Sequence, residues 1–463
     1  MIFEQYYLEC LSQASYLIAD ETSGRAIVVD PRRDIGQYLE AAEAHSATIE
    51  LVIETHFHAD FLSGHLEMAA ATGAEIAFGM SANPEFAARS LRDGERISLG
   101  QVTLEIRETP GHTPESISIV VYEHPDDIVP YGVLTGDTLF IGDVGRPDLL
   151  SSRGTTSDEL ASLLYDSLRD KLMTLPDATR LFPGHGAGSA CGKNLSSELS
   201  STIGEQRAGN YALQPMSREE FVHVVTEGQA AAPDYFAYDA ARNREEHELL
   251  SEHEHPAAMT IDSARDYARQ GAVLLDTRDP GEFASGSLVG SVNVGLEGRF
   301  AQYVGSVVKP DEQVVLLVEP GTELEAKVRL GRIGYDHIVG YVENLYEMLQ
   351  EHPELAQTAS RLTVGAFEER RQTIGDLQVI DVRNPGETDE GSIPGAHFLP
   401  MPRLRDGVQT LDRSRPTVVF CAGGYRSSIA ASLLRCNGFG DVSDIIGGYH
   451  AWHGAQTRRA VSS

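Results

Sequence analysis

Six histidine and aspartate side chains in the first half of the chain are candidate metal ligands. They follow apolar, strand-like runs and lie in turns rich in glycine and proline: His56, His58, Asp60, His112, Asp137 and His185. Imidazole nitrogens and carboxylate oxygens are common ligands of zinc and iron in proteins. A single histidine is more often structural, but several at strand ends, together with aspartates, predict a metal site.

A second segment with the composition of a reactive site lies near the C-terminus. The apolar run 417–420 leads into Cys421, and a helical pattern is predicted to begin at Ile429. A cysteine on a glycine-bearing loop that opens a helix is surrounded by backbone N–H groups, which favour a thiolate and a bound anion. We therefore predict that Cys421 is a nucleophile and that Arg426 acts with it. Contacts to the anion are expected from Gly423, Gly424, Tyr425 and Ser427.

Alternating strands and helices must position the candidate metal ligands. Over the first 240 residues, strand-like runs are predicted at 26–29, 51–54, 102–106, 116–122 and 132–135, and helical patterns at 35–44 and 157–175. This alternation is typical of an α/β layered fold, in which loops at strand ends bring distant side chains together. We expect the first domain to cover residues 1–240.

An internal repeat follows a polar linker that is predicted at residues 241–257. The segment Asp276-Thr277-Arg278-Asp279-Pro280-Gly281-Glu282 recurs as Asp381-Val382-Arg383-Asn384-Pro385-Gly386-Glu387, and in each copy apolar strands precede and follow it. Repetition of this kind indicates two homologous domains. We expect them at residues 258–355 and 360–463, each as a small doubly wound α/β sheet.

The composition argues against several classes of function. The 463 residues include 69 acidic and 37 basic side chains, a formal net charge of −32, and such a surface repels nucleic acid and anionic membranes. The longest apolar runs are much shorter than the roughly 20 residues of a membrane-spanning helix. No basic segment precedes an apolar one at the N-terminus, so we expect no signal peptide and a cytoplasmic location.

The candidate metal-binding segments resemble those of the metallo-β-lactamase superfamily. The resemblance implies an αββα sandwich with the metal at one edge. The usual signature is His-x-His-x-Asp-His, but Phe61 stands at its last position here. In binuclear zinc hydrolases of the superfamily that histidine binds the second metal, so Phe61 leaves the second site one ligand short. This argues against a zinc thioesterase of the glyoxalase II type, which remains the alternative.

Residues 136–149 resemble persulfide dioxygenases in particular. The resemblance implies one Fe(II) per chain, bound by His56, His112 and Asp137, a set that leaves open positions for O₂ chemistry. The remaining metal-binding types are then expected to orient ligands or relay protons, or to be remnants of a binuclear ancestor: His58, Asp60 and His185.

Two further residues are candidates for contacts with substrate in this first domain. A guanidinium binds carboxylate or phosphate in two-pronged fashion, so Arg146 is a candidate for the anionic part of the substrate, with a structural salt bridge as the alternative. Cys191 follows His185 closely enough to line the same cavity, where Lys193 could lower the pKa of its thiol. Packing among small residues is the slightly favoured alternative for Cys191.

The Cys421 loop, together with the Asp381–Glu387 segment, resembles the rhodanese family, in which the equivalent cysteine carries a persulfide. The spacing Cys-x₄-Arg is one residue shorter than the Cys-x₅-Arg loop of cysteine phosphatases, which favours sulfur transfer over phosphate hydrolysis. In the earlier copy the strand 313–318 leads into Glu319 at the place of the cysteine. We therefore expect residues 258–355 to be a rhodanese-like domain without its nucleophile.

The order of the three parts resembles bacterial fusion enzymes of sulfide detoxification. The resemblance implies that iron and O₂ oxidise a low-molecular-weight thiol persulfide, of glutathione, coenzyme A or a similar thiol, to sulfite. Cys421 then passes sulfane sulfur to sulfite to form thiosulfate, or runs the transfer in reverse. We expect a homo-oligomer, either a dimer or a tetramer, and no nucleic acid or membrane partner. A sulfur-relay protein with a vestigial metal site is a further alternative.

Overall fold

The structure is a computed structural model that describes residues 1–149, 155–229, 232–389 and 391–462. Its contacts form two compact units, one of residues 1–251 and 331–334, the other of residues 252–330 and 335–463. The division after Ser251 falls inside the predicted linker 241–257. Among the described residues, no helix is both long enough and apolar enough to cross a membrane.

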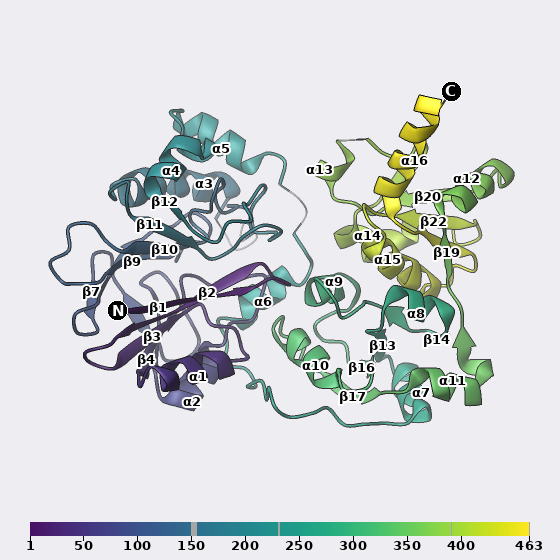
Figure 1. Cartoon of the computed structure of the whole chain (residues 1–463), viewed down its shortest axis with the longest axis horizontal. Coiled ribbons are helices and arrows are strands. Elements are labelled where there is room, and N and C mark those ends of the chain that lie inside the picture. The colour runs from purple at the N-terminus through teal and green to yellow at the C-terminus, as the bar shows by residue number, and fades with distance from the viewer. Residues whose placement is uncertain (150–154, 230–231, 390, 463) are drawn as a thin grey trace. The chain divides into compact units, whose positions relative to one another are not determined.

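Two six-stranded sheets face each other in the first unit (Figure 1). The first has the order β1-β2-β3-β4-β5-β6: β1 (Ile2–Leu8), β2 (Gln13–Asp20), β3 (Arg25–Val29), β4 (Thr48–Ile53), β5 (Glu75–Gly79) and β6 (Arg89–Leu91). The second has the order β12-β11-β10-β9-β8-β7: β7 (Arg96–Ser98), β8 (Thr103–Glu108), β9 (Ile117–Tyr122), β10 (Gly132–Gly136), β11 (Arg180–Pro183) and β12 (Ser201–Thr202). Apolar side chains of both sheets, such as Ile27 and Ile119, share one buried cluster between them.

Helices cover the outer face of each sheet in the first unit. On the first sheet lie α1 (Gly36–Ala44) and α2 (His65–Thr72), where Tyr38 and Met68 pack against Val28 and Val52. On the second lie α3 (Ser157–Asp166), the π-helix η2 (Ser167–Leu172), α4 (Ile203–Gly209), the short 3₁₀ turn η3 (Tyr211–Leu213) and α5 (Arg218–Thr226). The last helix before the division after Ser251 is α6 (Phe236–Arg242). This is the predicted αββα sandwich.

The second unit contains two parallel sheets of matching strand order. The middle repeat, residues 258–355, has the order β15-β13-β16-β17: β13 (Val273–Asp276), β15 (Val292–Asn293), β16 (Val314–Leu317) and β17 (Ile338–Val342). The last repeat, predicted at residues 360–463, has the order β19-β23-β22-β20-β21: β19 (Ser360–Leu362), β20 (Gln378–Asp381), β21 (His397–Phe398), β22 (Thr417–Phe420) and β23 (Val442–Ile445). A short antiparallel pair, β14 (Ser287–Leu288) and β18 (Ala356–Gln357), adjoins the middle repeat.

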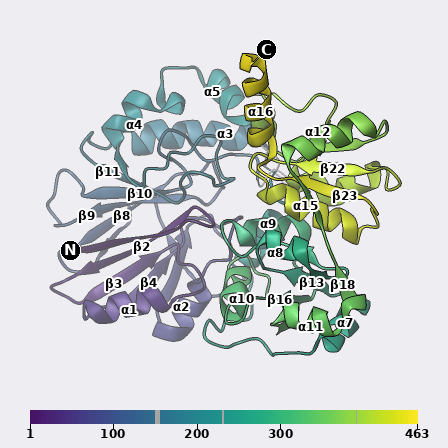
Figure 2. The ribbon, with the colours of Figure 1, turned by 45° about the vertical axis from the view of Figure 1, so that its right-hand side comes forward.

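Helices flank both sheets of the second unit (Figure 2). Those of the middle repeat are α7 (Ile261–Arg269), α8 (Pro280–Ser285), α9 (Phe300–Val307), α10 (Glu323–Gly331), α11 (Leu345–Glu351) and the 3₁₀ turn η4 (Pro353–Leu355). Those of the last repeat are α12 (Val364–Thr373), α13 (Pro385–Thr388), α14 (Met401–Gly407), the 3₁₀ turn η5 (Val408–Thr410), α15 (Tyr425–Cys436) and α16 (Gly448–Ser462). Each sheet is thus wound on both faces, as predicted.

The recurring sequence motif forms the same structure in both repeats. Arg278 donates to both carboxylate oxygens of Asp276, at 3.0 and 2.6 Å, and to the carbonyl of Gly286. Arg383 makes the same contacts to Asp381, at 3.0 and 2.7 Å, and to the carbonyl of Gly391. All four charged side chains are buried. Because a buried charge is stable only when it is paired, the motif repeats for a structural reason.

Candidate metal centre and cysteine loop

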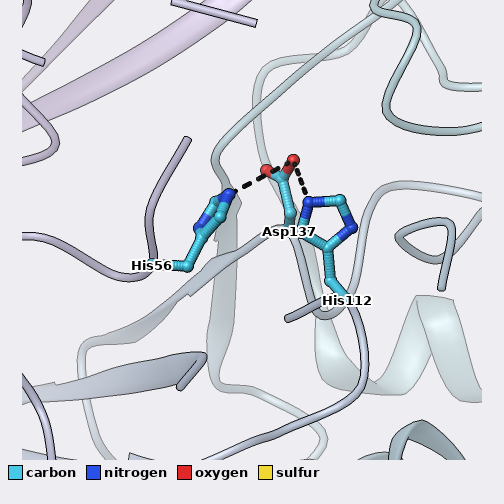
Figure 3. Close-up of side chains that lie close together, drawn as sticks. All are labelled: His56, His112 and Asp137. Atoms are coloured by element: carbon cyan, nitrogen blue, oxygen red, sulfur yellow. Dashed lines mark ion pairs between the residues drawn. The ribbon is translucent and has the colours of Figure 1, made fainter. Parts of the chain in front are cut away.

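Three of the predicted metal ligands converge on one point at the ends of strands. His56 follows β4, His112 follows β8 and Asp137 directly follows β10. Asp137 Oδ2 lies 3.9 Å from His56 Nε2 and 3.5 Å from His112 Nε2. Figure 3 shows both imidazole rings directed at the carboxylate. The three side chains are at most 2% exposed, so they form a buried set of two nitrogens and one oxygen, the donor set of a transition metal.

Hydrogen bonds fix the nitrogen that each histidine presents. His112 Nδ1 lies 2.8 Å from the carbonyl of Arg146, which can only accept, so Nδ1 carries the proton. His56 Nδ1 lies 3.0 Å from the hydroxyl of Thr55, whose own proton goes to Asp30 at 2.8 Å, so this Nδ1 is also the donor. Both Nε2 atoms therefore present lone pairs toward Asp137.

Two of the three donor atoms of this set lack a hydrogen-bond partner in the described part of the protein. Among the described residues, His56 Nε2 and Asp137 Oδ2 are buried and accept no hydrogen bond. Burial lowers the pKa of both His56 and His112. At His56 the neighbouring charge of His58 lowers it further. At Asp137 burial opposes ionisation, but the nearby His185 holds the pKa of the carboxyl below its usual range. Two neutral imidazoles and an ionised carboxylate are the protonation states that a divalent metal requires, so the residues fit such an ion.

The other predicted metal-binding side chains form a second buried cluster beside the first. His185 lies between two carboxylates, with Nδ1 2.8 Å from Asp137 Oδ1 and Nε2 2.7 Å from Asp60 Oδ2. Burial lowers the pKa of His185, but these two carboxylates outweigh it and raise the pKa well above its usual value. His185 thus engages one oxygen of Asp137 and leaves the other directed at His56 and His112.

His58 does not join the three converging ligands. Its Nε2 lies 3.1 Å from Asp30 and 3.7 Å from Glu54. The ring of Phe61 is completely buried beside it, with the two ring centroids 4.3 Å apart. Phe61 therefore places an apolar ring within the cluster where the superfamily signature has a histidine.

Asn243 anchors the loop that carries these side chains, and it was not among the predicted site residues. Its side-chain amide donates to the carbonyls of His58 and Phe61, both at 2.8 Å, and accepts from the backbone N–H of Ser63 at 2.8 Å. The residue is 1% exposed. The predicted start of the linker at residue 241 is therefore wrong, because α6 continues to Arg242 and Asn243 is packed in the first unit. One asparagine in a polar run carries no distinguishing signal.

The buried side chain of Arg146 forms an ion pair with Asp148. Its guanidinium donates to both oxygens of Asp148 at 2.7 Å and to the carbonyl of Ala190 at 3.1 Å, and the side chain is 2% exposed. These contacts correspond to the structural alternative named for it above. The same residue also positions a ligand, since its backbone carbonyl accepts the hydrogen bond from His112.

Cys191 lies beside the cluster, and its thiol is not activated by Lys193. Its sulfur lies within 4.8 Å of donor atoms of Asp137 and His185. Burial, reinforced by the charges of Asp60 and Asp137, raises the pKa of the thiol well above its usual value. Lys193 instead donates to the backbone carbonyls of Val224 and Glu227. The buried, unactivated thiol agrees with packing, the alternative slightly favoured above, and not with activation by Lys193.

The Cys421 loop joins β22 to α15 through four residues. Cys421 is 1% exposed, and its sulfur accepts a hydrogen bond from the backbone N–H of Gly424 at 3.1 Å. Gly424 has φ +107°, a conformation that residues with a Cβ rarely adopt. The Ser427 hydroxyl is 3.7 Å from the sulfur. The helix begins at Tyr425, four residues before the predicted Ile429, because the glycine turn ends the loop earlier than the polar side chains suggested.

Arg426 is paired within the last repeat. Its two terminal nitrogens donate to the two carboxylate oxygens of Glu387, each at 2.6 Å. The pair joins the Cys421 loop to the start of α13, the helix of the recurring motif. The charge of Arg426 is therefore balanced by Glu387.

The strand register corrects the position assigned to Glu319. Asp276 pairs with Leu317 on β16, as Asp381 pairs with Phe420 on β22. The residue that corresponds to Cys421 is therefore Val318, and Glu319 follows it in a loop that is one residue longer. Val318 is 1% exposed and has no nucleophilic group, so the expectation of a repeat without a nucleophile does not depend on Glu319.

Family comparisons recognise both parts of the chain. The metallo-beta-lactamase superfamily model matches residues 8–185, and the rhodanese-like domain model matches residues 364–455. A crystal structure described as a metallo-beta-lactamase from Staphylococcus aureus is 31% identical, with a TM-score of 0.68, over 74% of this chain and 99% of that one.

Two curated relatives resemble part of the chain. The mitochondrial persulfide dioxygenase ETHE1 of Homo sapiens is 29% identical over 219 residues, which are 46% of this chain and 75% of that protein. The hydroxyacylglutathione hydrolase of Rhodospirillum rubrum is 34% identical over 173 residues, 37% of this chain and 60% of that protein. Taken with the buried metal centre and the cysteine loop, these matches show that the chain belongs to the metallo-β-lactamase superfamily and carries a C-terminal rhodanese domain.

Proposed function

We propose that the chain is a non-haem iron persulfide dioxygenase joined to a sulfurtransferase. The observation that carries the proposal is the convergence of His56, His112 and Asp137, with Phe61 at the place of a second-metal histidine. Iron(II) held by two imidazoles and one carboxylate supplies open positions for a thiol persulfide and O₂. The resemblance to persulfide dioxygenases supports this metal and this substrate class.

The oxygenase reaction balances with one water molecule. A persulfide RSSH, O₂ and H₂O give the thiol RSH, sulfite and two protons; the S–S bond breaks, the terminal sulfur is oxidised and O₂ is reduced. His185, placed between Asp60 and Asp137, can hold a proton near the reacting sulfur. Backbone and side-chain contacts from Arg146 and Thr55 keep the imidazoles in the tautomer that binds metal.

Sulfur transfer would take place on Cys421. Its thiolate takes the outer sulfur of a second persulfide and releases the thiol. Sulfite then attacks that outer sulfur; the S–S bond to Cys421 breaks and the S–S bond of thiosulfate forms. The Gly424 N–H donates to Cys421 Sγ and stabilises the returning thiolate. The same steps in reverse would make a persulfide from thiosulfate and a thiol.

An oxygen electrode and metal analysis test the proposal together. Protein loaded with iron under anaerobic conditions should contain about one iron per chain and consume O₂ with glutathione persulfide or coenzyme A persulfide. Sulfite and thiosulfate should account for the oxidised sulfur.

The competing assignment is a zinc thioesterase, favoured by the similarity to a hydroxyacylglutathione hydrolase. Two zinc ions per active chain, hydrolysis of S-lactoylglutathione and no O₂ uptake would establish it in place of the dioxygenase. Sulfur loading of Cys421 without O₂ uptake or thioester hydrolysis would indicate a sulfur-relay protein.

A further inference from the structure

The helix that follows Cys421 is bound along one side to the middle repeat. Tyr425, the first residue of α15, donates its hydroxyl to the backbone carbonyl of Gly295 at 2.8 Å and lies 3.2 Å from that of Glu297. Two turns further on, the hydroxyl of Ser432 accepts from the backbone N–H of Asn293 at 3.0 Å. The loop of the nucleophile and the segment 293–297 are therefore held in a defined relation.

Arg329 of the middle repeat holds the same segment from within. Its guanidinium donates to the carbonyls of Leu296 at 2.5 Å and Gly298 at 2.6 Å. Successive carbonyls along 295–298 thus alternate between Tyr425 and Arg329. The guanidinium carbon also lies 5.5 Å from the centre of the Phe300 ring, at the start of α9. This segment and α9 therefore lie beside the start of α15 (Figure 2).

Tyr303, on α9, lies next to the cysteine loop. Its ring meets that of Tyr425 edge to face, with centroids 5.3 Å apart. Burial raises the pKa of its phenol; Arg426 and Arg299 act against this shift and Cys421 adds to it. The phenol is therefore protonated at neutral pH. Its hydroxyl makes no hydrogen bond to any part of the chain that the structure describes.

Two of the donors near Cys421 are already engaged by groups of the protein. The Gly424 N–H is directed at the sulfur, and the terminal nitrogens of Arg426 are paired with Glu387. An oxyanion that approaches the sulfur needs donors for its oxygens, because desolvating them without replacement is costly. The unpaired hydroxyl beside the site is suited to this role.

We propose that Tyr303 is a binding residue of the sulfurtransfer site, with its hydroxyl donating a hydrogen bond to the sulfur oxyanion that reaches Cys421. The middle repeat, which has no nucleophile, thereby contributes a residue to the site of the last repeat. The ligand class is a sulfur oxyanion, sulfite or thiosulfate. This inference rests on the proposed sulfurtransferase function and assigns it a residue from the other repeat.

Steady-state kinetics of sulfur transfer from thiosulfate to cyanide provide the first test. Tyr303→Phe removes only the hydroxyl, so the KM for thiosulfate should rise about tenfold, as expected for one hydrogen bond to a charged group. The kcat should stay within about twofold of wild type, because sulfur chemistry on Cys421 does not use the phenol. Tyr346→Phe is the matched control: Tyr346 lies on α11 of the same repeat, is 69% exposed and should leave KM unchanged.

A binding measurement separates this inference from the proposed function. Iodoacetamide is neutral, and its reaction with Cys421, followed by mass spectrometry, reports access to the thiol. Sulfate should slow this alkylation by occupying the anion site, and about tenfold more sulfate should be needed in Tyr303→Phe. The alkylation rate without sulfate should match wild type.

The results of these two experiments decide whether the Tyr303 hydroxyl binds the anion. If the variant keeps the wild-type KM and the wild-type protection by sulfate, Tyr303 does not bind the anion. A changed alkylation rate in the absence of sulfate would equally overturn the proposal, because the loop itself would then be altered. If wild type transfers no sulfur, the proposed function fails, and the sulfate protection still tests Tyr303 by itself.

Discussion

At the metal centre, the two oxygens of Asp137 have different tasks. Oδ1 accepts from His185 at 2.8 Å, whereas Oδ2 faces the Nε2 atoms of His56 and His112. A carboxylate oriented by one neighbour presents its other oxygen to a metal in a fixed direction. The charge of Asp137 is also the one negative charge within the three-ligand set.

Asp137→Asn should therefore abolish metal binding while preserving the side-chain shape. Iron content after dialysis should fall below about one tenth of the wild-type value, because a neutral amide is a poor ligand. His58→Gln is the comparison: the His58 ring packs against that of His56, but its Nε2 faces Asp30 and Glu54 rather than the converging donor atoms, so the iron content of this variant should stay close to that of wild type. Equal iron content in wild type and Asp137→Asn would contradict the assigned ligand set.

We predict that Phe61 limits the number of metal ions that the cluster can hold. Its buried ring is adjacent to His58 and follows Asp60 in the chain. Phe61→His supplies an imidazole next to Asp60 and His185, and metal content in the presence of zinc should rise from about one ion toward two per chain. Plasma mass spectrometry of the dialysed protein measures this ratio. A ratio that stays at one would show that more than this side chain prevents a second ion from binding.

The sequence allowed the candidate ligands to be named because each lies in a short turn with its own motif. The contacts that orient them could not be predicted. Thr55 and Asp30 fix the tautomer of His56 through a chain of hydrogen bonds, and such chains depend on side chains brought together from separate strands. The two roles considered for Arg146 could be compared only after its partner Asp148 was seen.

At the scale of elements, the loop 58–63 connects β4 to α2 and depends on a residue from the end of α6. Asn243 satisfies the carbonyls of His58 and Phe61 and the N–H of Ser63. All four residues are buried, so an unpaired group here is costly. The loop that precedes α2 is thus held by a segment that is remote in sequence.

Asn243→Ala should destabilise the first unit. Leaving these backbone groups unpaired is expected to cost about 1–3 kcal/mol, which thermal unfolding of the iron-loaded protein would measure as a lowered Tm. Asn194→Ala is the comparison, since Asn194 is held through its backbone N–H to Asp143 and its side chain makes no hydrogen bond to the residues that the structure describes. A Tm of Asn243→Ala equal to that of Asn194→Ala would contradict the anchoring role.

Strands were easier to predict than the ends of helices. The runs 26–29 and 132–135 lie within β3 and β10 to one residue at each end, because apolar residues buried on both faces give continuous runs. The predicted helix 157–175 is α3 followed by a π-helix and a turn, and no local pattern marks that change. The strand pair β1–β2 was missed, although most of its side chains are apolar or aromatic.

At the scale of the whole molecule, the repeat predicted from Asp276–Glu282 and Asp381–Glu387 corresponds to two sheets of matching strand order. The register also shows that one inserted loop residue moves Glu319 away from the nucleophile position. A sequence comparison anchored only on the motif cannot locate that insertion. The metal ligands belong to the first unit and Cys421 to the second, so the two proposed half-reactions use separate sets of side chains.

Mutation should therefore abolish either half-reaction without the other. Cys421→Ser should leave O₂ consumption on glutathione persulfide within about twofold of wild type, while the product changes from thiosulfate to sulfite, because oxygenation needs only the metal, O₂ and the persulfide. His56→Ala should do the reverse: O₂ uptake is lost with the metal, but thiosulfate:cyanide sulfur transfer persists, since the thiolate on its loop is unchanged. Cys436→Ser, which alters a thiol elsewhere on α15, controls for nonspecific effects in the last repeat. If Cys421→Ser stopped O₂ uptake with full iron content and an unchanged Tm, the two reactions would be obligately linked, and the division of chemistry between the units would be incorrect.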